Sequence, residues 1–371
     1  MTDLELKKSL LSCPGDTIQE HIDYVKMSQA ELAERLGRSI PKLNELIKGK
    51  APITKDTATK LEYVLDIPAS FWINLERKYQ DEKLEIDRME HLEKCKEWVS
   101  NFPLRSMKSI GVIPNTRDKS VLAESLLKFF RVASPEQWSE IYKGSSLAFK
   151  IELRHTAEPE AISVWLRLGE IQAEKLEIGD FNKSAIKKNF IGFKNILYRC
   201  EKGWLNQLQA LCAKLGIALV YTPCIAKAPI YGCTRWIKNN SFPLIQITDR
   251  GKDYHSFWFT FYHELAHILY HGKKDIFIEG LPNIKPDIAK ENEADDFAAK
   301  KLLSDKEKKD LFQNFSFDSQ LIFRYSEKFE THPSIIVGQI QRKHNELYKS
   351  RSLNRLKVKV KFEDLKLDKS F

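Results

Sequence analysis

One short stretch, residues 263–267 (His-Glu-Leu-Ala-His), constrains the fold and the chemistry of this chain more than any other. On a helix, positions i and i+4 lie one above the other, so His263 and His267 can direct two imidazole nitrogens to one point. Zn²⁺ binds neutral imidazole readily, and a catalytic zinc site keeps one position open for water. Glu264 would flank that water, where its carboxylate can accept a proton. Residues 258–269 are otherwise almost all apolar, which predicts a buried helix.

A second predicted helix, residues 291–303, supplies a third candidate metal ligand. At about 100° per residue, Glu291 falls among the apolar residues of this helix, whereas Glu293 points nearly opposite. A carboxylate that faces a core is costly unless it binds a cation. Asp295, one turn later, shares the face of Glu291 and is expected to hydrogen-bond a ligating histidine from behind. Glu293 is the alternative ligand if the helix phase is shifted, and an ordinary packing helix with solvated acids is the competing interpretation.

The residues around both helices follow a longer pattern. Residues 263–271 read HELAHILYH, and residues 291–303 read ENEADDFAAKKLL. Supporting segments lie at residues 231–236, 243–247, 253–260 and 332–340. Over about residues 195–345, the chain thus resembles the ImmA/IrrE family of metallo-endopeptidases, whose pattern is HELxHxxxH followed by ExEA(N/D)xFAAxLL. The resemblance implies a zinc protease that cleaves one dedicated protein, a repressor or antitoxin-like partner.

Several polar residues near the motif are candidates for the substrate cleft. His271 lies one turn after His267, so it either lines the cleft and binds a transition-state oxygen or is an ordinary surface histidine. Further candidates for binding that oxygen are Tyr262, Tyr231, Arg235 and His332. The sequence does not rank them.

The region around the motif is expected to be a small α+β fold. Residues 216–221, 228–237 and 244–248 read as short strands, which would lie beside the two helices of the metal site. An edge strand of such a sheet can bind a substrate segment by strand addition.

The N-terminal region has the pattern of two short helices joined by a tight turn. Ser28 is placed to cap the first helix, with Glu31 as its capping-box partner, and Gly37 suits the sharp turn that follows. Ser39 can cap the second helix, and Pro41 falls in its first turn, where a missing N–H does no harm. This is the pattern of a helix-turn-helix, whose second helix reads the major groove of DNA.

Charge supports a DNA-binding face here. Residues 1–80 hold twelve basic and twelve acidic side chains, but residues 35–60 hold seven basic against two acidic ones. One basic face on a neutral domain is what phosphate contact requires. The predicted DNA-binding residues are Gln29, Arg38, Ser39, Lys42, Asn44 and Lys48. A small helical packing module with solvated lysines is the competing interpretation.

Residues 28–79 also resemble the HigA-type antitoxins of the XRE helix-turn-helix class. The resemblance is carried by the opening Ser-Gln-x-x-Leu-Ala and by residues 52–58, 61–65 and 71–76, the last reading FWINLE. It implies binding to a palindromic operator as a homodimer. It does not show that a cognate toxin exists.

The 371 residues, 42% of them hydrophobic, allow two or three domains. We expect a multidomain chain with these regions: 1–80, an all-α helix-turn-helix domain; 81–194, a helical middle region; 195–345, an α+β zincin-like metallopeptidase domain; and 346–371, a basic tail. The middle region should begin as a charged helical spacer and contain helices at residues 121–130 and 161–176. Trp138, Trp165 and Phe149 should belong to its core. Its role, as a sensor or as a coupling arm, is left open.

The tail has ten basic against four acidic side chains over residues 341–371, and residues 356–362 alternate as a half-buried strand would. Its lysines would protect a sheet edge or contact DNA. The six cysteines are scattered without metal spacing, and no signal peptide or membrane-spanning run is seen. A cytoplasmic protein with no membrane contact is therefore expected.

Three classes of function fit these features. The first is a DNA-binding zinc endopeptidase that cleaves a repressor, an antitoxin or itself. The second is a HigA-type antitoxin or transcriptional regulator whose metal site is a sensor or a non-catalytic remnant. The third is a non-catalytic scaffold that binds DNA and a toxin. Glu264 favours the first class, because a purely structural zinc site needs no carboxylate beside an open metal position.

Overall fold

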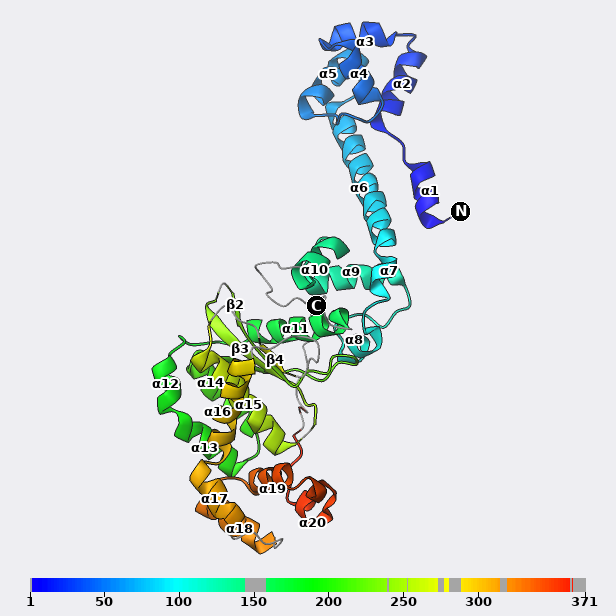
Figure 1. The fold of residues 1–371 in the computed structure, drawn as a ribbon. Coiled ribbons are helices and arrows are strands. Elements are labelled where there is room, and N and C mark those ends of the chain that lie inside the picture. The colour runs from blue at the N-terminus through cyan, green and yellow to red at the C-terminus, as the bar shows by residue number, and fades with distance from the viewer. Residues whose placement is uncertain are drawn as a thin grey trace. The chain divides into compact units, whose positions relative to one another are not determined.

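The computed structural model describes residues 2–143, 158–238, 240–251, 253–272, 277–279, 288–313, 319–360 and 362. The chain forms two compact units (Figure 1). One comprises Met1–Glu97 and Asp118–Glu124, and the other comprises Trp98–Arg117 and Ser125–Phe371. The first is helical throughout its described residues, and the second combines helices with one small mixed sheet. The expectation of a multidomain chain with helical and α+β parts is thus confirmed at this level.

The first unit is built mainly from six helices, and all of them except the first contribute to one apolar core. They are α1 (Asp3–Leu10), α2 (Pro14–Tyr24), α3 (Gln29–Leu36), α4 (Ile40–Ile47), α5 (Lys55–Leu65) and α6 (Ala69–Lys94). The buried core residues include Ile18, Leu32, Leu43, Leu61 and Trp72. The charged stretch expected after residue 80 is the continuation of α6, as predicted.

The pair α3 and α4 has helix-turn-helix form, because Gly37 adopts a left-handed conformation with φ of 65° between them. The Ser28 hydroxyl accepts a hydrogen bond from the Glu31 amide at 3.1 Å. The reciprocal half of the expected capping box is replaced by an ion pair of the Glu31 carboxylate with Arg35 at 2.7 Å. Ser39 occupies the N-cap position of α4, but its side chain makes no capping hydrogen bond.

The remaining helices belong mainly to the second unit. They are α7 (Lys96–Val99), α8 (Leu104–Ile110), α9 (Lys119–Phe130), α10 (Pro135–Tyr142), α11 (Pro159–Glu174), α12 (Lys183–Lys188), α13 (Phe190–Arg199), α14 (Trp204–Lys214), α15 (Tyr254–Tyr270), α16 (Ile288–Leu302), α17 (Asp305–Gln313), α18 (Ser319–Lys328), α19 (Pro333–Lys343) and α20 (Arg351–Arg355). Within the described ranges, none of the helices is both long enough and apolar enough to cross a membrane.

The sheet of the second unit has the order β1-β3-β2-β4. Its strands are β1 (Ala218–Tyr221), β2 (Gly232–Ile237), β3 (Phe242–Ile247) and β4 (Phe277–Glu279). Strand β1 runs parallel to β3, whereas β2 runs antiparallel to both β3 and β4. The first three strands are those that the sequence predicts. Strand β4 was not predicted, and it lies at the edge beside β2.

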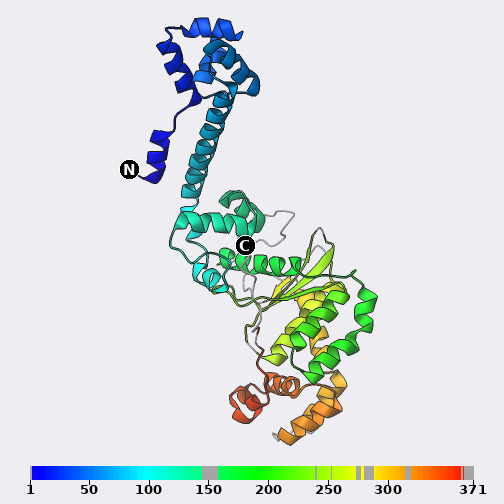
Figure 2. The same ribbon diagram turned by 180° about the vertical axis from the view of Figure 1, so that it is seen from behind.

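Helices cover both faces of this sheet (Figure 1, and Figure 2 from behind). Alternation along the strands sends Leu219 and Ile245 into the core shared with α15, and Val220 and Leu244 into a smaller cluster with Ala173 of α11. The helix α11, which the sequence assigns to the middle region, therefore packs directly on the sheet.

Polar contacts join α11 to the middle strands. The Gln246 amide donates a hydrogen bond to the Trp165 carbonyl at 2.6 Å, and Arg235 donates one to the Leu166 carbonyl at 2.6 Å. Trp165 and Trp138 are buried as predicted. Phe149 lies outside the described residues.

The tail differs from the predicted strand. In the part of residues 356–362 that the structure describes, a single bridge joins Lys359 to Asp253. The Lys357 ammonium pairs with the Asp253 carboxylate at 2.8 Å, and the Val358 amide donates to the Ser334 hydroxyl at 2.9 Å. The alternating pattern therefore reflects a segment that is fastened to the start of α15, with Val360 buried, and not a strand of the sheet.

Candidate metal centre

The His-Glu-x-x-His segment lies on α15, which begins after the N-cap residue Asp253. Nearly every residue of this helix from Tyr254 to Leu269 is buried, as the apolar sequence predicts. Helix α16 packs along α15 and buries Ala294 and Ala298, whose small side chains permit a close approach of the two helices. This approach brings the acidic residues of α16 to the histidines of α15.

Three side chains, those of His263, His267 and Glu291, converge where the two helices meet. The Nε2 atoms of His263 and His267 are 3.0 Å apart. The Glu291 carboxylate lies 3.2 Å from His263 Nε2 and 3.8 Å from His267 Nε2. One potential ligand atom from each of the three residues lies within 4.8 Å of the others. The helix phase expected for Glu291 is therefore the phase found.

This arrangement fits a small divalent metal ion. Two nitrogens bound at zinc distances to one tetrahedral ion are roughly 3.3 Å apart, close to the separation of the two Nε2 atoms. Both Nε2 atoms face Glu291, while the Nδ1 atoms on the far side of both rings have other partners. Histidine ligands of metals usually donate their second N–H to such a partner.

The partner of His263 is Asp295, whose carboxylate lies 2.9 Å from His263 Nδ1. His267 Nδ1 lies 2.8 Å from Nδ1 of His271, and His271 Nε2 lies 3.2 Å from the Glu293 carboxylate. If both ligands present Nε2 to a metal, each Nδ1–H donates outward, directly to Asp295 or through His271 to Glu293. Two carboxylates thus support the two imidazoles.

Burial keeps His267 in the form that binds a metal. Desolvation, followed by the positive charge that His263 would carry, lowers the pKa of His267 to about 2. The ring is therefore neutral at physiological pH, as metal coordination requires. The Phe277 ring of β4 stacks on the His267 ring with centroids 3.7 Å apart, which contributes to this burial.

Glu264 is completely buried, with 0% of its surface exposed. Its carboxylate lies against the first residue of β2, since a Cβ atom added to Gly232 would stand 2.5 Å from Glu264 Oε1. The Thr234 hydroxyl donates to the Glu264 carbonyl at 3.1 Å. The start of β2 therefore fixes α15 and leaves only enough space for the Glu264 side chain.

Three of the cleft candidates lie elsewhere. Tyr262 is buried in the apolar core of α15, where it packs against Trp258. Arg235, 2% exposed, points to the opposite face of the sheet and contacts Glu170 at 3.6 Å. His332 caps α19 by accepting a hydrogen bond from the Ser334 amide. These positions correct the expectation that these three side chains line the cleft.

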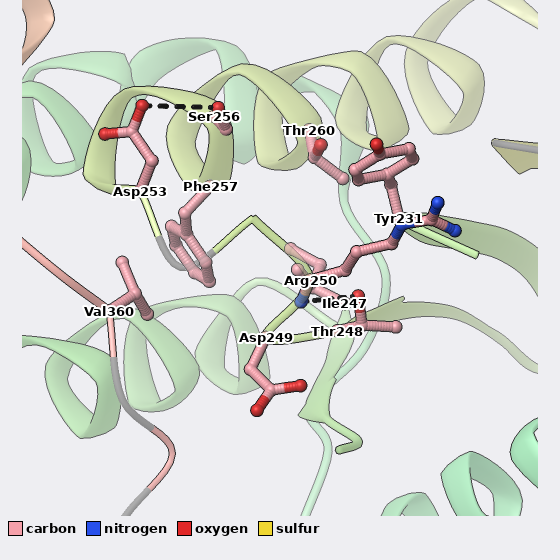
Figure 3. A pocket seen from close by; sticks show the side chains of 10 residues that line it. All are labelled: Tyr231, Ile247, Thr248, Asp249, Arg250, Asp253, Ser256, Phe257, Thr260 and Val360. Atoms are coloured by element: carbon pink, nitrogen blue, oxygen red, sulfur yellow. Dashed lines mark hydrogen bonds between the residues drawn. The ribbon is translucent and has the colours of Figure 1, made fainter. Parts of the chain in front are cut away.

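Tyr231, 37% exposed, directly precedes Gly232 and lines a small cavity with Thr260 of α15 (Figure 3). The Arg250 guanidinium stacks on the Tyr231 ring at 4.7 Å and orients it. Of the predicted cleft residues, Tyr231 is thus the one that stays beside the buried carboxylate of Glu264. His271 is not an ordinary surface histidine, because its side chain is 4% exposed and its Nδ1 lies 2.8 Å from Nδ1 of His267.

Sequence reasoning missed Gly232, Phe277 and the link from His271 to Glu293. The i+4 spacing of His267 and His271 was the available signal for that link. Gly232 and Phe277 carry no local signal, since their place beside the site depends on the pairing of β2 with β4.

The predicted DNA-binding residues lie on or beside α3 and α4. Lys42, Lys48 and Ser39 are exposed, and Asn44 is half-buried. Two others make contacts inside the unit. The Arg38 guanidinium donates to the Thr57 hydroxyl of α5, and the Gln29 amide donates to the Gln19 side chain. Of the predicted contact residues, the exposed cations are therefore Lys42 on α4 and Lys48 directly after it.

Comparison with known proteins gives a family match within the second unit and similarity to a curated protein. Residues 212–336 match the family model Peptidase_M78, described as the IrrE N-terminal-like domain. Over 83 residues, the chain is 29% identical to the "Uncharacterized HTH-type transcriptional regulator YddM" of Escherichia coli (strain K12), which covers 21% of this chain and 88% of that protein. The C-terminal part thus carries a metallopeptidase-type domain of the ImmA/IrrE family, and the chain has weak similarity to a helix-turn-helix transcriptional regulator.

Proposed function

We propose that this protein is a DNA-binding transcriptional regulator whose zinc-dependent endopeptidase domain cleaves one specific protein, a repressor or an antitoxin-like partner. The observation that carries the proposal is the convergence of His263, His267 and Glu291, with the buried Glu264 next to His263 on the same helix. A site with three protein ligands and a neighbouring carboxylate suits hydrolysis better than a purely structural role. In line with the regulator similarity, the protein is expected to act in the cytoplasm.

In this proposal, His263, His267 and Glu291 hold the zinc ion, with Asp295 and His271 fixing the two imidazole rings. When bound, zinc supplies Lewis acidity, which polarises a peptide carbonyl and lowers the pKa of water. The Glu264 carboxylate takes the proton of the attacking water and then delivers it to the amine of the leaving product. Tyr231 is the candidate donor to the oxygen of the tetrahedral intermediate.

The edge strand β4 offers a way to bind an extended substrate. Its backbone pairs with β2 on one side, and its Phe277 ring lies on His267. A substrate segment added along this edge would run past the metal ligands, with main-chain hydrogen bonds holding it in register. The direct test is to incubate zinc-loaded protein with purified products of the neighbouring genes. New fragments would be identified by mass spectrometry, with a chelated sample as the control.

Gly232 gives a graded test of the fit between β2 and Glu264. Gly232→Ala would place a methyl group 2.5 Å from Glu264 Oε1 and 2.6 Å from Thr260 Cγ2, so the carboxylate must move. Because misplacing a catalytic group costs up to about a hundredfold, we expect the cleavage rate to fall roughly tenfold to a hundredfold. The control is Gly192→Ala on α13, where the added atom meets only the end of the Leu211 side chain at 3.3 Å. Equal cleavage by Gly232→Ala and wild type would refute the proposed position of Glu264.

The first unit supports the DNA-binding half of the proposal. Its α4 presents Lys42 and Lys48 from a unit of helix-turn-helix form, and the regulator similarity agrees. We propose that α4 enters the major groove of a palindromic operator and that two copies of the chain bind as a homodimer. A cognate toxin partner remains part of the alternative function, that of a HigA-type antitoxin.

Single substitutions at α4 should show which side chains contact phosphates and which contact bases. We expect Lys42→Ala and Lys48→Ala each to weaken operator binding by about fivefold. Each should also reduce the magnitude of the slope of log affinity against log salt concentration by about 0.9. Asn44→Ala should weaken binding by about tenfold with an unchanged salt slope. Fluorescence anisotropy with promoter DNA measures both, and Lys78→Ala on α6, 75% exposed, is the matched control. If the full chain ignores promoter DNA even at low salt, the operator assignment is wrong.

A further inference from the structure

The segment of the second unit that contains α12 and α13 is strongly basic. Residues 181–200 hold five basic and no acidic side chains. One of them, Arg199, lies 3.7 Å from the Glu201 carboxylate. The other four form no ion pair within the described parts of the chain, and they are Lys183, Lys187, Lys188 and Lys194. The first three are exposed and Lys194 is half-buried, so this segment presents uncompensated positive charge to solvent.

Helix α16 adds a fifth lysine to this basic segment. The Lys301 ammonium lies 3.6 Å from the ring centroid of Phe190, the first residue of α13, and 5.3 Å from that of Phe297. An ammonium over an aromatic ring is attracted by the negative face of the ring. Lys301 is therefore held beside α13 by two rings, and among the described residues it has no carboxylate partner.

Apolar side chains lie among these lysines. Ile191, next to Phe190, is 73% exposed. The Phe190 ring contacts the Phe297 ring of α16 at 5.9 Å, and Phe297 contacts the Tyr270 ring at 5.4 Å. Tyr270, 45% exposed, is the last residue of α15 and follows His267 by one turn. A row of apolar side chains thus runs from α13 across α16 to the helix that carries the two histidines.

This combination of side chains indicates the chemistry of a partner. Unpaired lysines attract carboxylates and phosphates alike. Exposed apolar side chains such as Ile191 have no counterpart on the phosphates of a nucleic acid, to which lysines usually bind. A polypeptide segment that carries both acidic and apolar side chains can satisfy the lysines and cover the apolar row together.

We propose that this lysine–aromatic surface is the docking surface for an acidic, partly apolar segment of the protein that the peptidase domain cleaves. Its residues are Lys183, Lys187, Lys188, Phe190, Ile191, Lys194, Tyr270, Phe297 and Lys301. That the docked partner is the substrate rests on the proposed function, whereas the docking itself requires neither zinc nor cleavage. Because α15 and α16 also carry the metal cluster, a partner held here keeps its remaining chain at high local concentration near that cluster.

The test uses the full-length protein and two fluorescein-labelled peptides, with binding measured by fluorescence anisotropy at low salt. The first peptide is Glu-Glu-Leu-Glu-Glu-Leu-Glu-Glu-Leu-Glu, and the second has serine in place of each leucine. The surface variants are Lys187→Glu combined with Lys188→Glu, and Ile191→Ser, all at exposed positions.

The matched control is Lys349→Glu combined with Arg351→Glu. These exposed residues precede and begin α20, which lies apart from α12 and α13 in both views (Figures 1 and 2). The control makes the same change of net charge on the same unit. Circular dichroism checks that all the variants fold.

We expect the leucine peptide to bind wild type saturably and to bind the double lysine variant about tenfold more weakly, because two attractive charges become repulsive. Ile191→Ser should weaken binding of the leucine peptide by about threefold, because it removes an apolar contact. The same variant should bind the serine peptide as wild type does. The control variant should keep wild-type affinity for both peptides.

Three results would overturn the proposal. The first is no saturable binding of the leucine peptide to wild type, and the second is equal binding by the double lysine variant and the control. The third is a loss in the double lysine variant that affects a short duplex DNA of random sequence but not the peptide, which would make the surface a nucleic-acid contact. A failure of the peptidase proposal would instead appear as absent cleavage with peptide docking intact.

Discussion

Glu264→Gln should lower the rate of substrate cleavage by about a thousandfold, because general acid–base catalysis by one positioned side chain contributes about 10²–10⁴-fold. The amide has nearly the same shape as the carboxylate, so it fits the space beside Gly232. It cannot, however, accept the proton of the attacking water. His263, His267 and Glu291 are unchanged by this substitution, so zinc should still bind at about one ion per chain.

The measurement compares initial cleavage rates of wild type and variant with the same protein substrate, and metal analysis accompanies each sample. Thermal melting and operator affinity should stay close to wild type, because the variant replaces a buried charge with a neutral group of equal volume. Glu327→Gln on α18, an exposed position, is the matched control and should cleave normally. If Glu264→Gln cleaves at the wild-type rate, the peptidase proposal is wrong and the regulator or antitoxin alternative is favoured.

The convergence of the three proposed metal ligands was predictable because helical periodicity is a local property of the sequence. The i, i+4 spacing brings His263 and His267 together, and the apolar positions of α16 determine which of its acids faces α15. Glu291 and Asp295 accordingly lie where the phase calculation puts them. The strands β1, β2 and β3 were predictable for a similar reason, since each is a short apolar run.

The errors concern features that depend on long-range contacts. Because side chains alternate along β2, Thr234 and Arg235 must point to opposite faces of the sheet. The sequence does not say which of these faces α15 covers. Arg235 therefore appeared to be a cleft residue, although it contacts Glu170 on the other face. His271 follows the last residue of α15, so only the docking of α16 brings Glu293 to it. The tail alternates like a strand, yet the sequence does not reveal that its partner is the start of α15.

His263→Ala should reduce bound zinc from about one ion per chain to almost none, because it removes one of three protein ligands and leaves a site with two. A graded loss should follow from His271→Ala. Without the His271 ring, His267 Nδ1 loses its partner at 2.8 Å, and the connection to the Glu293 carboxylate is broken. Loss of such a supporting residue weakens metal binding by about 10–100-fold. His344→Ala, at a histidine outside the cluster, should bind zinc like wild type.

Metal content by mass spectrometry and zinc affinity by competition with a chelating dye distinguish these outcomes. The order of affinities should be wild type and His344→Ala first, His271→Ala next, and His263→Ala last. Zinc should raise the melting temperature of the wild-type protein, because a ligand that binds only the folded state stabilises it, and this gain should shrink in the same order. Unaltered zinc affinity in His271→Ala would mean that the chain from His267 through His271 to Glu293 only packs the cleft wall. Retention of zinc by a folded His263→Ala protein would contradict the proposed ligand set itself.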